Sequence, residues 1–130
     1  YKAAGNIMIN RSKTDKAKNV LSQVVDEIKN RKVSVWIFPE GTRNKSGEGL
    51  LPFKKGSFHM AVAAQVPVVP LVCSSVNRVA DWKRKKLAGG SLKVKILPPI
   101  PTNGLTENDV DNLTEEVREK MLAALNEIEK

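Results

Sequence analysis

A β-type run, Val33-Ser34-Val35-Trp36-Ile37, passes directly into the polar string Phe38-Pro39-Glu40-Gly41-Thr42-Arg43. The near-continuous apolar stretch 33–38 predicts a central parallel strand that is buried on most sides. Pro39 has no backbone N–H to donate to a neighbouring strand, so strand pairing should stop there. Gly41 allows a positive φ and close approach of a ligand. Because open α/β sheets bind ligands outside the carboxyl ends of their strands, we expect a binding site here.

The side chains of this candidate site supply a carboxylate, a hydroxyl and a guanidinium, from Glu40, Thr42 and Arg43. The planar fork of Arg43 suits a phosphate, because it can donate two parallel hydrogen bonds to an oxyanion. The same residues also fit a plain polar turn with Glu40 and Arg43 as a solvated pair. Local chemistry alone leaves both interpretations open.

The spacing of apolar residues predicts the elements before and after this strand. Residues 5–9 read as a short strand, and a helix capped by Thr14 or Asp15 precedes the basic residues at 30–32. The order strand, helix, strand implies a right-handed crossover between parallel strands. The apolar face of the predicted helix is formed by Ala17, Val20, Leu21, Val24, Val25 and Ile28.

Further elements are predicted downstream. A charged loop over 44–49 leads to a short helix from 56 to about 64, with Ser57 as a cap. A buried strand over 66–75 contains two prolines that argue for an edge or a bulge, and a half-exposed strand follows over 91–97. The last helix runs from about 106 to 128 with one apolar stripe: Val110, Leu113, Val117, Met121, Leu125 and Ile128. The predicted fold class is α/β, a single domain with a mixed, mainly parallel sheet flanked by helices.

Charge is distributed unevenly along the 130 residues, whose net charge is +8. Residues 1–100 carry a net charge of +13 and residues 101–130 a net charge of −5. A basic body suits anionic partners such as phosphomonoesters, coenzyme A or anionic lipid headgroups. Nucleic acid is disfavoured, since aromatic residues for base stacking are scarce. The run Lys83-Arg84-Lys85-Lys86 beside Trp82 fits either a membrane interface or a solvated loop.

Cys73 is the single cysteine, so no internal disulfide can form and a reduced compartment is expected. Its place in an apolar run predicts a small buried hydrophobe. No apolar stretch approaches the roughly 20 residues that span a bilayer.

Four strings, taken together, resemble one family. The string at 38–43 resembles the F-P-E-G-T-R motif of the glycerolipid acyltransferases, specifically the 1-acylglycerol-3-phosphate acyltransferases. Residues 5–11 resemble their G-x-x-F-I-x-R element, residues 53–58 their F-K-x-G-x-F stretch, and residues 66–70 their V-P-V-x-P element. Their order and spacing match the family from Gly5 to about Ser75.

The resemblance also identifies what this chain lacks. In the family the catalytic histidine and aspartate lie in an H-x-x-x-x-D motif upstream of the G-x-x-F-I-x-R element. His59, the only histidine, follows the F-P-E-G-T-R string and has Ala64 where the aspartate is needed. His59 is therefore interpreted as a residue on a helix face or as a buried structural histidine. We expect residues 1–130 to be the C-terminal part of an acyltransferase domain, with no catalytic residue of its own and no activity alone.

The resemblance implies transfer of a fatty acyl group from acyl-coenzyme A or acyl carrier protein to 1-acylglycerol-3-phosphate, giving phosphatidate, with no cofactor and no metal. Arg11 and Arg43 would bind the phosphate, and Lys54 is a weaker candidate for the same anion. Glu40, Gly41 and Thr42 would shape the glycerol pocket. The residues expected to border the site are Phe38, Pro39, Val66, Pro67 and Pro70.

The expected location is the cytoplasmic face of the inner or plasma membrane, with the protein peripheral or anchored through an N-terminal part outside this chain. The partners are then the lysophosphatidate, the acyl thioester and the membrane surface. An alternative function is a non-catalytic module that binds anionic lipid or phosphate in the same basic crevice, because such a module needs no histidine.

Overall fold

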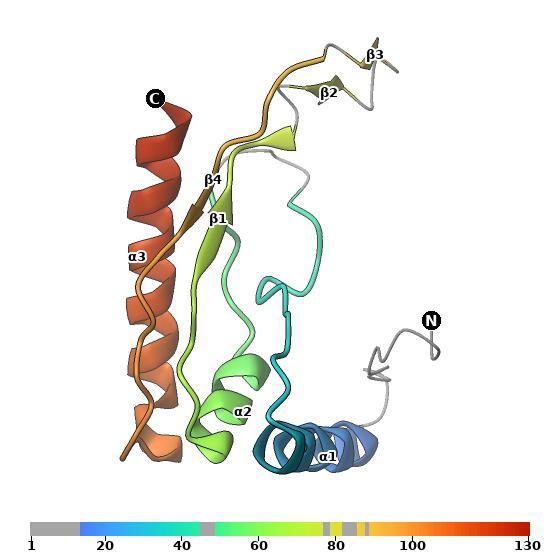
Figure 1. Cartoon of the computed structure of the whole chain (residues 1–130), viewed down its shortest axis with the longest axis vertical. Helices are drawn as coiled ribbons and strands as arrows, with labels where there is room; N and C mark the ends of the chain where they lie inside the picture. The colour runs from blue at the N-terminus through green and yellow to red at the C-terminus, as the bar shows by residue number, and fades with distance from the viewer. Residues whose placement is uncertain (1–13, 45–48, 77–78, 82–85, 88) are drawn as a thin grey trace.

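The structure, a computed structural model, describes residues 14–44, 49–76, 79–81, 86–87 and 89–130. The predicted strand over 5–9, Arg11, Trp82 and the first three residues of the basic run, 83–85, lie outside these residues. The described elements, drawn in Figure 1, are α1 (Thr14–Arg31), α2 (Gly56–Ala64), β1 (Leu71–Cys73), β2 (Ala80–Asp81), β3 (Lys86–Leu87), β4 (Val94–Ile96), the 3-10 turn η3 (Glu107–Asp109) and α3 (Val110–Glu129).

Helix α1 confirms the helix predicted from the 3.6-residue period. Val24 and Ile28 on its apolar face are buried. After the last turn Lys32 takes a φ of 53°, and its N–H donates to the Ile28 carbonyl at 3.1 Å. The helix therefore ends among the basic residues that favour a helix C-terminus. Partly buried apolar residues pack around this face: Val20, Leu21 and Val25.

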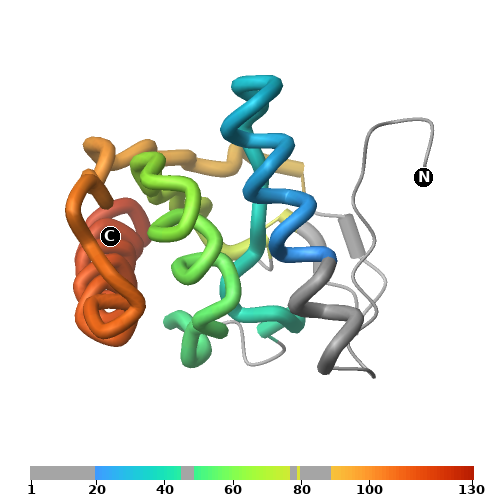
Figure 2. Tube along the Cα trace, turned by 90° about the horizontal axis from the view of Figure 1, so that it is seen from below, coloured from blue at the N-terminus to red at the C-terminus, as the bar shows by residue number. Residues whose placement is uncertain are grey.

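Helix α2 is apolar on two sides and packs against a different helix on each. Phe58 and Val62 join a core cluster with α3, whereas Met60 and Ala64 join a smaller cluster with α1. Figure 1 and Figure 2 both show α2 between α1 and α3. A helix of nine residues is too short to be stable alone, so these two contacts hold it in place. Ser57 was expected to cap it, but the N-cap residue is Lys55.

The 3-10 turn η3, which leads directly into α3, begins with a capping box. The Asp109 carboxylate accepts hydrogen bonds of 2.8 Å from both the N–H and the hydroxyl of Thr106. These bonds satisfy donors that a helix start leaves open. The predicted apolar stripe is confirmed as buried: Val110, Leu113, Val117, Met121 and Leu125.

The strands pair in two short antiparallel ladders, β1 with β4 and β2 with β3. Val72 of β1 lies opposite Lys95 of β4, and an isolated bridge joins Val68 to Ile100. The ladder between these two sites is interrupted beside Pro70, as expected for a residue without an N–H. The described residues therefore contain no parallel pairing. Of the two segments expected to supply it, 5–9 lies outside the described residues, and 33–38 is not paired with any of them.

The stretch 33–38 corrects one prediction. It forms no strand with the described residues, and Trp36 and Phe38 are 68% and 76% exposed. Their rings touch edge to face, with centroids 6.3 Å apart. The prediction of a buried central strand is wrong in this structure, because burial needs hydrogen-bonded neighbours and covered faces that the described residues do not provide.

One further prediction is corrected on β1, and β4 exposes its apolar residues. Cys73 is exposed rather than buried. On β4, within the strand predicted to be half-exposed, the apolar residues Val94 and Ile96 are exposed. Lys95 turns toward α3 instead, where its ammonium forms an ion pair with Glu127. Lys95 therefore lies on the side of β4 that faces the acidic helix.

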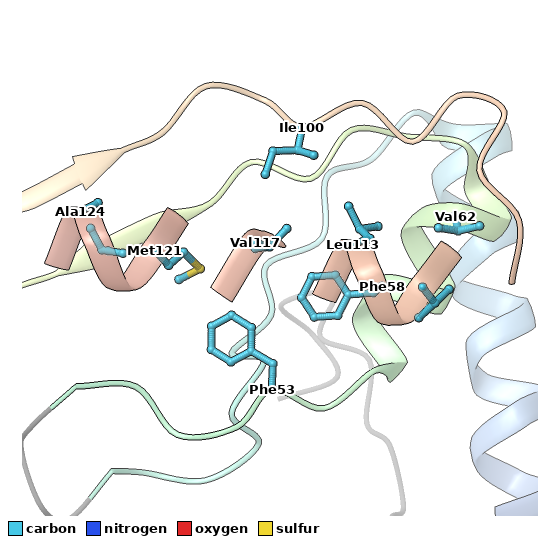
Figure 3. Packing of buried hydrophobic residues seen from close by; sticks show 10 residues of the cluster. Phe53, Phe58, Val62, Ile100, Leu113, Val117, Met121 and Ala124 are labelled. Carbon is cyan, nitrogen blue, oxygen red and sulfur yellow. The ribbon is translucent and has the colours of Figure 1, made fainter. Parts of the chain in front are cut away.

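The main core lies between α3, α2 and the segments that lead to the strands (Figure 3). Phe53 and Phe58 stack there with ring centroids 6.2 Å apart. Thr102, which is fully buried, donates from its hydroxyl to the Val66 carbonyl at 2.8 Å. Among the described residues, none of the helices offers an apolar stretch long enough to cross a membrane.

Candidate functional site

The F-P-E-G-T-R string forms a tight turn. The Gly41 N–H donates to the Phe38 carbonyl at 3.2 Å, and Gly41 has a φ of 69°. A residue with a side chain is strained at this φ, which explains the glycine. The predicted role of Gly41 as the conformationally permissive residue of the motif therefore has a structural basis.

Two hydrogen bonds tie this turn to the segment that returns from the following loop. The Glu40 carboxylate accepts from the Leu51 N–H at 2.8 Å, and the Pro39 carbonyl accepts from the Lys54 N–H at 2.7 Å. Glu40 thus closes the loop between the motif and Leu51. Its carboxylate shapes the site through the backbone.

Thr42 and Arg43, the last two residues of the motif, are exposed. Within the part of the chain that the structure describes, Arg43 has no ion-pair partner. Its guanidinium therefore keeps its donors for solvent or a ligand, as a phosphate-binding arginine requires. Arg11, predicted to act with it, lies outside the described residues.

A pocket of about 250 Å³ lies beside the turn. Lys54 supplies a cation at its edge, and the first turn of α2 supplies backbone N–H groups from Gly56 and Ser57. No acidic residue lies in that first turn, and no side chain caps it. A helix start with open N–H groups favours an anion. The pocket is lined by Ile37, Phe38, Pro39, Gly41, Lys54, Gly56 and Ser57.

The two adjacent lysines differ in their partners. Lys55 Nζ lies 2.8 Å from Asp111 Oδ1 on α3, whereas Lys54 forms no ion pair with the described residues. Lys54 is therefore the better placed of the two to meet an anionic ligand. Sequence proximity alone did not distinguish them, since Asp111 is far along the chain.

Ser57 was not among the residues predicted for the site, although it lines the pocket. Its hydroxyl oxygen is shielded from solvent and has no hydrogen-bond partner in the structure as described. The sequence signal was its position directly after the glycine of the F-K-x-G-x-F stretch, which was interpreted as a cap. His59, one turn into α2, is exposed, in agreement with a residue on the face of the helix.

The three predicted bordering residues beyond α2 lie outside this pocket. Val66 packs against the cluster between α1 and α2, and its carbonyl is held by Thr102. Pro67 is exposed and Pro70 is buried at the entry to β1. In this structure they therefore belong to the connection between α2 and β1. Phe38 and Pro39, by contrast, do line the pocket.

The comparisons with known proteins identify one family. The model of the Acyltransferase family matches residues 1–74, more than half of the chain. The human 1-acyl-sn-glycerol-3-phosphate acyltransferase alpha is 47% identical over 125 residues, which cover 96% of this chain and 44% of the human protein. The Escherichia coli 1-acyl-sn-glycerol-3-phosphate acyltransferase is 38% identical over 100% of this chain and 52% of its own length. The chain thus spans about half the length of the relatives it matches.

A solved structure gives the same result for the fold. The crystal structure of the 1-acyl-sn-glycerophosphate acyltransferase from Thermotoga maritima superposes with a TM-score of 0.73 at 29% identity. The match covers 88% of this chain and 46% of that chain. It confirms the predicted α/β class and acyltransferase-like fold. The chain therefore belongs to the acyltransferase family, as the resemblance of its F-P-E-G-T-R string indicated.

Proposed function

We propose that this chain forms the acceptor side of an enzyme that transfers a fatty acyl group from an acyl thioester to 1-acylglycerol-3-phosphate, giving phosphatidate. The observation that carries the proposal is the pocket in which Gly41 of the motif, Lys54 and the start of α2 meet. The names of the relatives support the choice of acceptor. Coenzyme A and acyl carrier protein are the two donors considered, and no further cofactor is invoked.

The acceptor phosphate lies, in this proposal, between Arg43 and the start of α2. Arg43 supplies a bidentate donor, Lys54 a second charge, and the N–H groups of Gly56 and Ser57 complete the anion site. Arg11 is proposed as a further phosphate ligand from its match to the family motif. Glu40 and Gly41 act through the shape of the turn, and Thr42 adds a hydroxyl at the glycerol.

The acyl transfer itself needs a base that takes the proton from the attacking hydroxyl of the acceptor. Among the 130 residues the only histidine is His59, and Ala64 stands where its aspartate is required. In this proposal the base is therefore a residue of an H-x-x-x-x-D motif outside this chain. The acceptor hydroxyl attacks the thioester carbonyl, the carbon–sulfur bond breaks, and the thiol leaves with the proton.

The test is thioester consumption with acyl-coenzyme A and 1-acylglycerol-3-phosphate. The purified chain is compared with a protein that adds an upstream H-x-x-x-x-D segment to it. We expect activity only when that segment is present. A folded extended protein without activity would contradict the proposal.

The alternative is a module that binds anionic lipid or phosphate without turnover. The exposed His59, with Ala64 in place of an aspartate, favours it, because binding alone needs no base. A membrane surface is then the natural partner, and the same partner is proposed for the enzyme, at a cytoplasmic membrane face. Binding of the chain to vesicles containing phosphatidate, with no thioester consumption by the extended protein, would support the module.

A further inference from the structure

One peptide group near the site has both of its polar atoms bound to charged side chains. The carbonyl of Leu50 accepts from Arg118 Nη2 at 3.4 Å, and the N–H of Leu51 donates to Glu40 Oε2 at 2.8 Å. These two atoms belong to the same planar peptide unit. A cation therefore lies at its oxygen and an anion at its hydrogen. Hydrogen bonds arranged in this way polarise one another and strengthen.

The surroundings of Arg118 make this contact important. Its side chain is only 26% exposed, and Nη1 lies 3.3 Å from Glu115 Oε1. Its Nε is buried and has no hydrogen-bond partner within the described part of the chain. Burying a charged group without hydrogen-bond partners costs free energy, so each partner of this half-buried guanidinium matters for its stability. The Leu50 carbonyl is the partner that lies outside α3.

The segment that carries this peptide group is held between α3 and the motif. On one side Phe53 inserts into the core next to Val117 of α3 (Figure 3). On the other side the Lys54 N–H binds the Pro39 carbonyl at 2.7 Å. A shift of the segment relative to α3 would therefore move the motif turn, and Gly41 with it, at the edge of the pocket.

We propose that Arg118 is a positioning residue for the motif turn, acting on Glu40 through the Leu50–Leu51 peptide group. The consequence for turnover rests on the proposed function, whereas the bridge itself does not. Arg118 lies outside residues 1–74, which match the family model. The inference therefore extends the site to the C-terminal helix.

The first test measures hydrogen exchange of the Leu51 amide in the full 130-residue chain by NMR. We compare Arg118→Gln, Glu40→Gln and the double substitution. Loss of one charged hydrogen-bond partner is expected to speed exchange by roughly 10-fold or more. If the bridge exists, the double substitution speeds exchange by less than the product of the two single effects. Independent effects, or an unchanged amide in Arg118→Gln, would overturn the proposal.

Three variants separate the bridge from general damage to α3. Arg118→Lys keeps a cation near the carbonyl and should restore much of the protection. Glu115→Gln removes only the neighbouring carboxylate and should leave Leu51 nearly unchanged. Arg31→Gln removes an exposed helical arginine paired with Glu27 and serves as the matched control. An equal effect of Arg31→Gln on Leu51 would contradict a specific bridge.

The second test uses an active protein that contains this chain. Arg118→Gln should raise the KM for the lysophosphatidate severalfold and leave the KM for acyl-coenzyme A unchanged. A changed Leu51 amide without any change in acceptor KM would refute the positioning role. If the protein that contains this chain is inactive before substitution, while Arg118 and Glu40 still show coupled effects on Leu51 amide exchange, the result would count against the proposed function alone.

Discussion

The Thr102 hydroxyl donates a hydrogen bond of 2.8 Å to the Val66 carbonyl and so joins the segment before η3 to the connection that follows α2. Thr102 is fully buried, so Thr102→Val keeps the shape but leaves that carbonyl without this donor. We expect the free energy of unfolding to fall by about 1 to 3 kcal/mol in urea titrations.

Thr114→Val is the control for that substitution. Thr114 is also buried, but its hydroxyl binds the Val110 carbonyl within the same helix, at 2.7 Å. That carbonyl also has a backbone partner one turn along α3, so a smaller loss is expected. Equal losses of unfolding free energy in the two variants would show that the hydrogen bond between Thr102 and Val66 stabilises the fold no more than the one within α3.

Arg43→Ala tests the proposed phosphate contact in an active protein that contains this chain. Removing one charged partner of a phosphate should raise the KM for lysophosphatidate roughly 10- to 150-fold. Arg31→Ala is the matched control, because Arg31 is an exposed arginine on α1 whose side chain is 70% accessible. Unchanged acceptor kinetics in Arg43→Ala would remove Arg43 from the site.

The adjacent lysines provide a second pair of variants. Lys54→Gln should raise the KM for lysophosphatidate by on the order of 10-fold, since Lys54 lines the pocket. Lys55→Gln should leave that KM unchanged, because its ammonium is bound to Asp111. Its stability cost should be at most about 1 kcal/mol, as for an exposed ion pair. If the assignment is wrong, steady-state kinetics would show a larger increase in the KM for lysophosphatidate in Lys55→Gln than in Lys54→Gln.

The capping box before α3 predicts a dependence of stability on pH. The N–H and hydroxyl of Thr106 lower the pKa of Asp109 below its ordinary value of 3.8. A lowered pKa in the folded state stabilises the fold above the ordinary value, and this stabilisation is lost as pH falls through the lowered one. The urea midpoint should decrease as the pH is lowered through that acidic range. It should decrease less steeply in Asp109→Asn.

Glu127 provides the comparison for this pH effect. Its pKa is also lowered, first by the hydrogen bond from Lys95 and then by the charge of Lys95. Glu127→Gln should therefore remove a separate part of the acid sensitivity. A pH profile that neither Asp109→Asn nor Glu127→Gln changes would contradict both assignments.

The helices were predictable from the sequence because their burial is periodic. The stripes of α1 and α3 follow the 3.6-residue period, and Gly56 begins α2 as expected. The strands were less predictable, because an apolar run such as 33–38 does not say which partners cover it. The partner of Lys95 is Glu127, which lies 32 residues away, so the period of the strand alone does not predict this contact.

The site was predictable where its residues are close in sequence. Gly41 and Lys54 belong to neighbouring motifs, and the structure places both at one pocket. The closure of the loop by Glu40 was not predictable, because its partner is a backbone N–H with no sequence signal. The contribution of Arg118 depends on a contact across 68 residues and follows only from the packing of α3.

Helix α2 makes the two core clusters thermodynamically dependent on each other. Among the described residues no close backbone contact joins α1 to α3, so the two clusters are linked through α2 and the residues that follow it, such as Val66. Loss of either cluster removes one wall of a helix that cannot persist alone. Helices α1 and α3 should therefore unfold in a single cooperative transition. The first turn of α2, at the pocket, would be lost in that same transition.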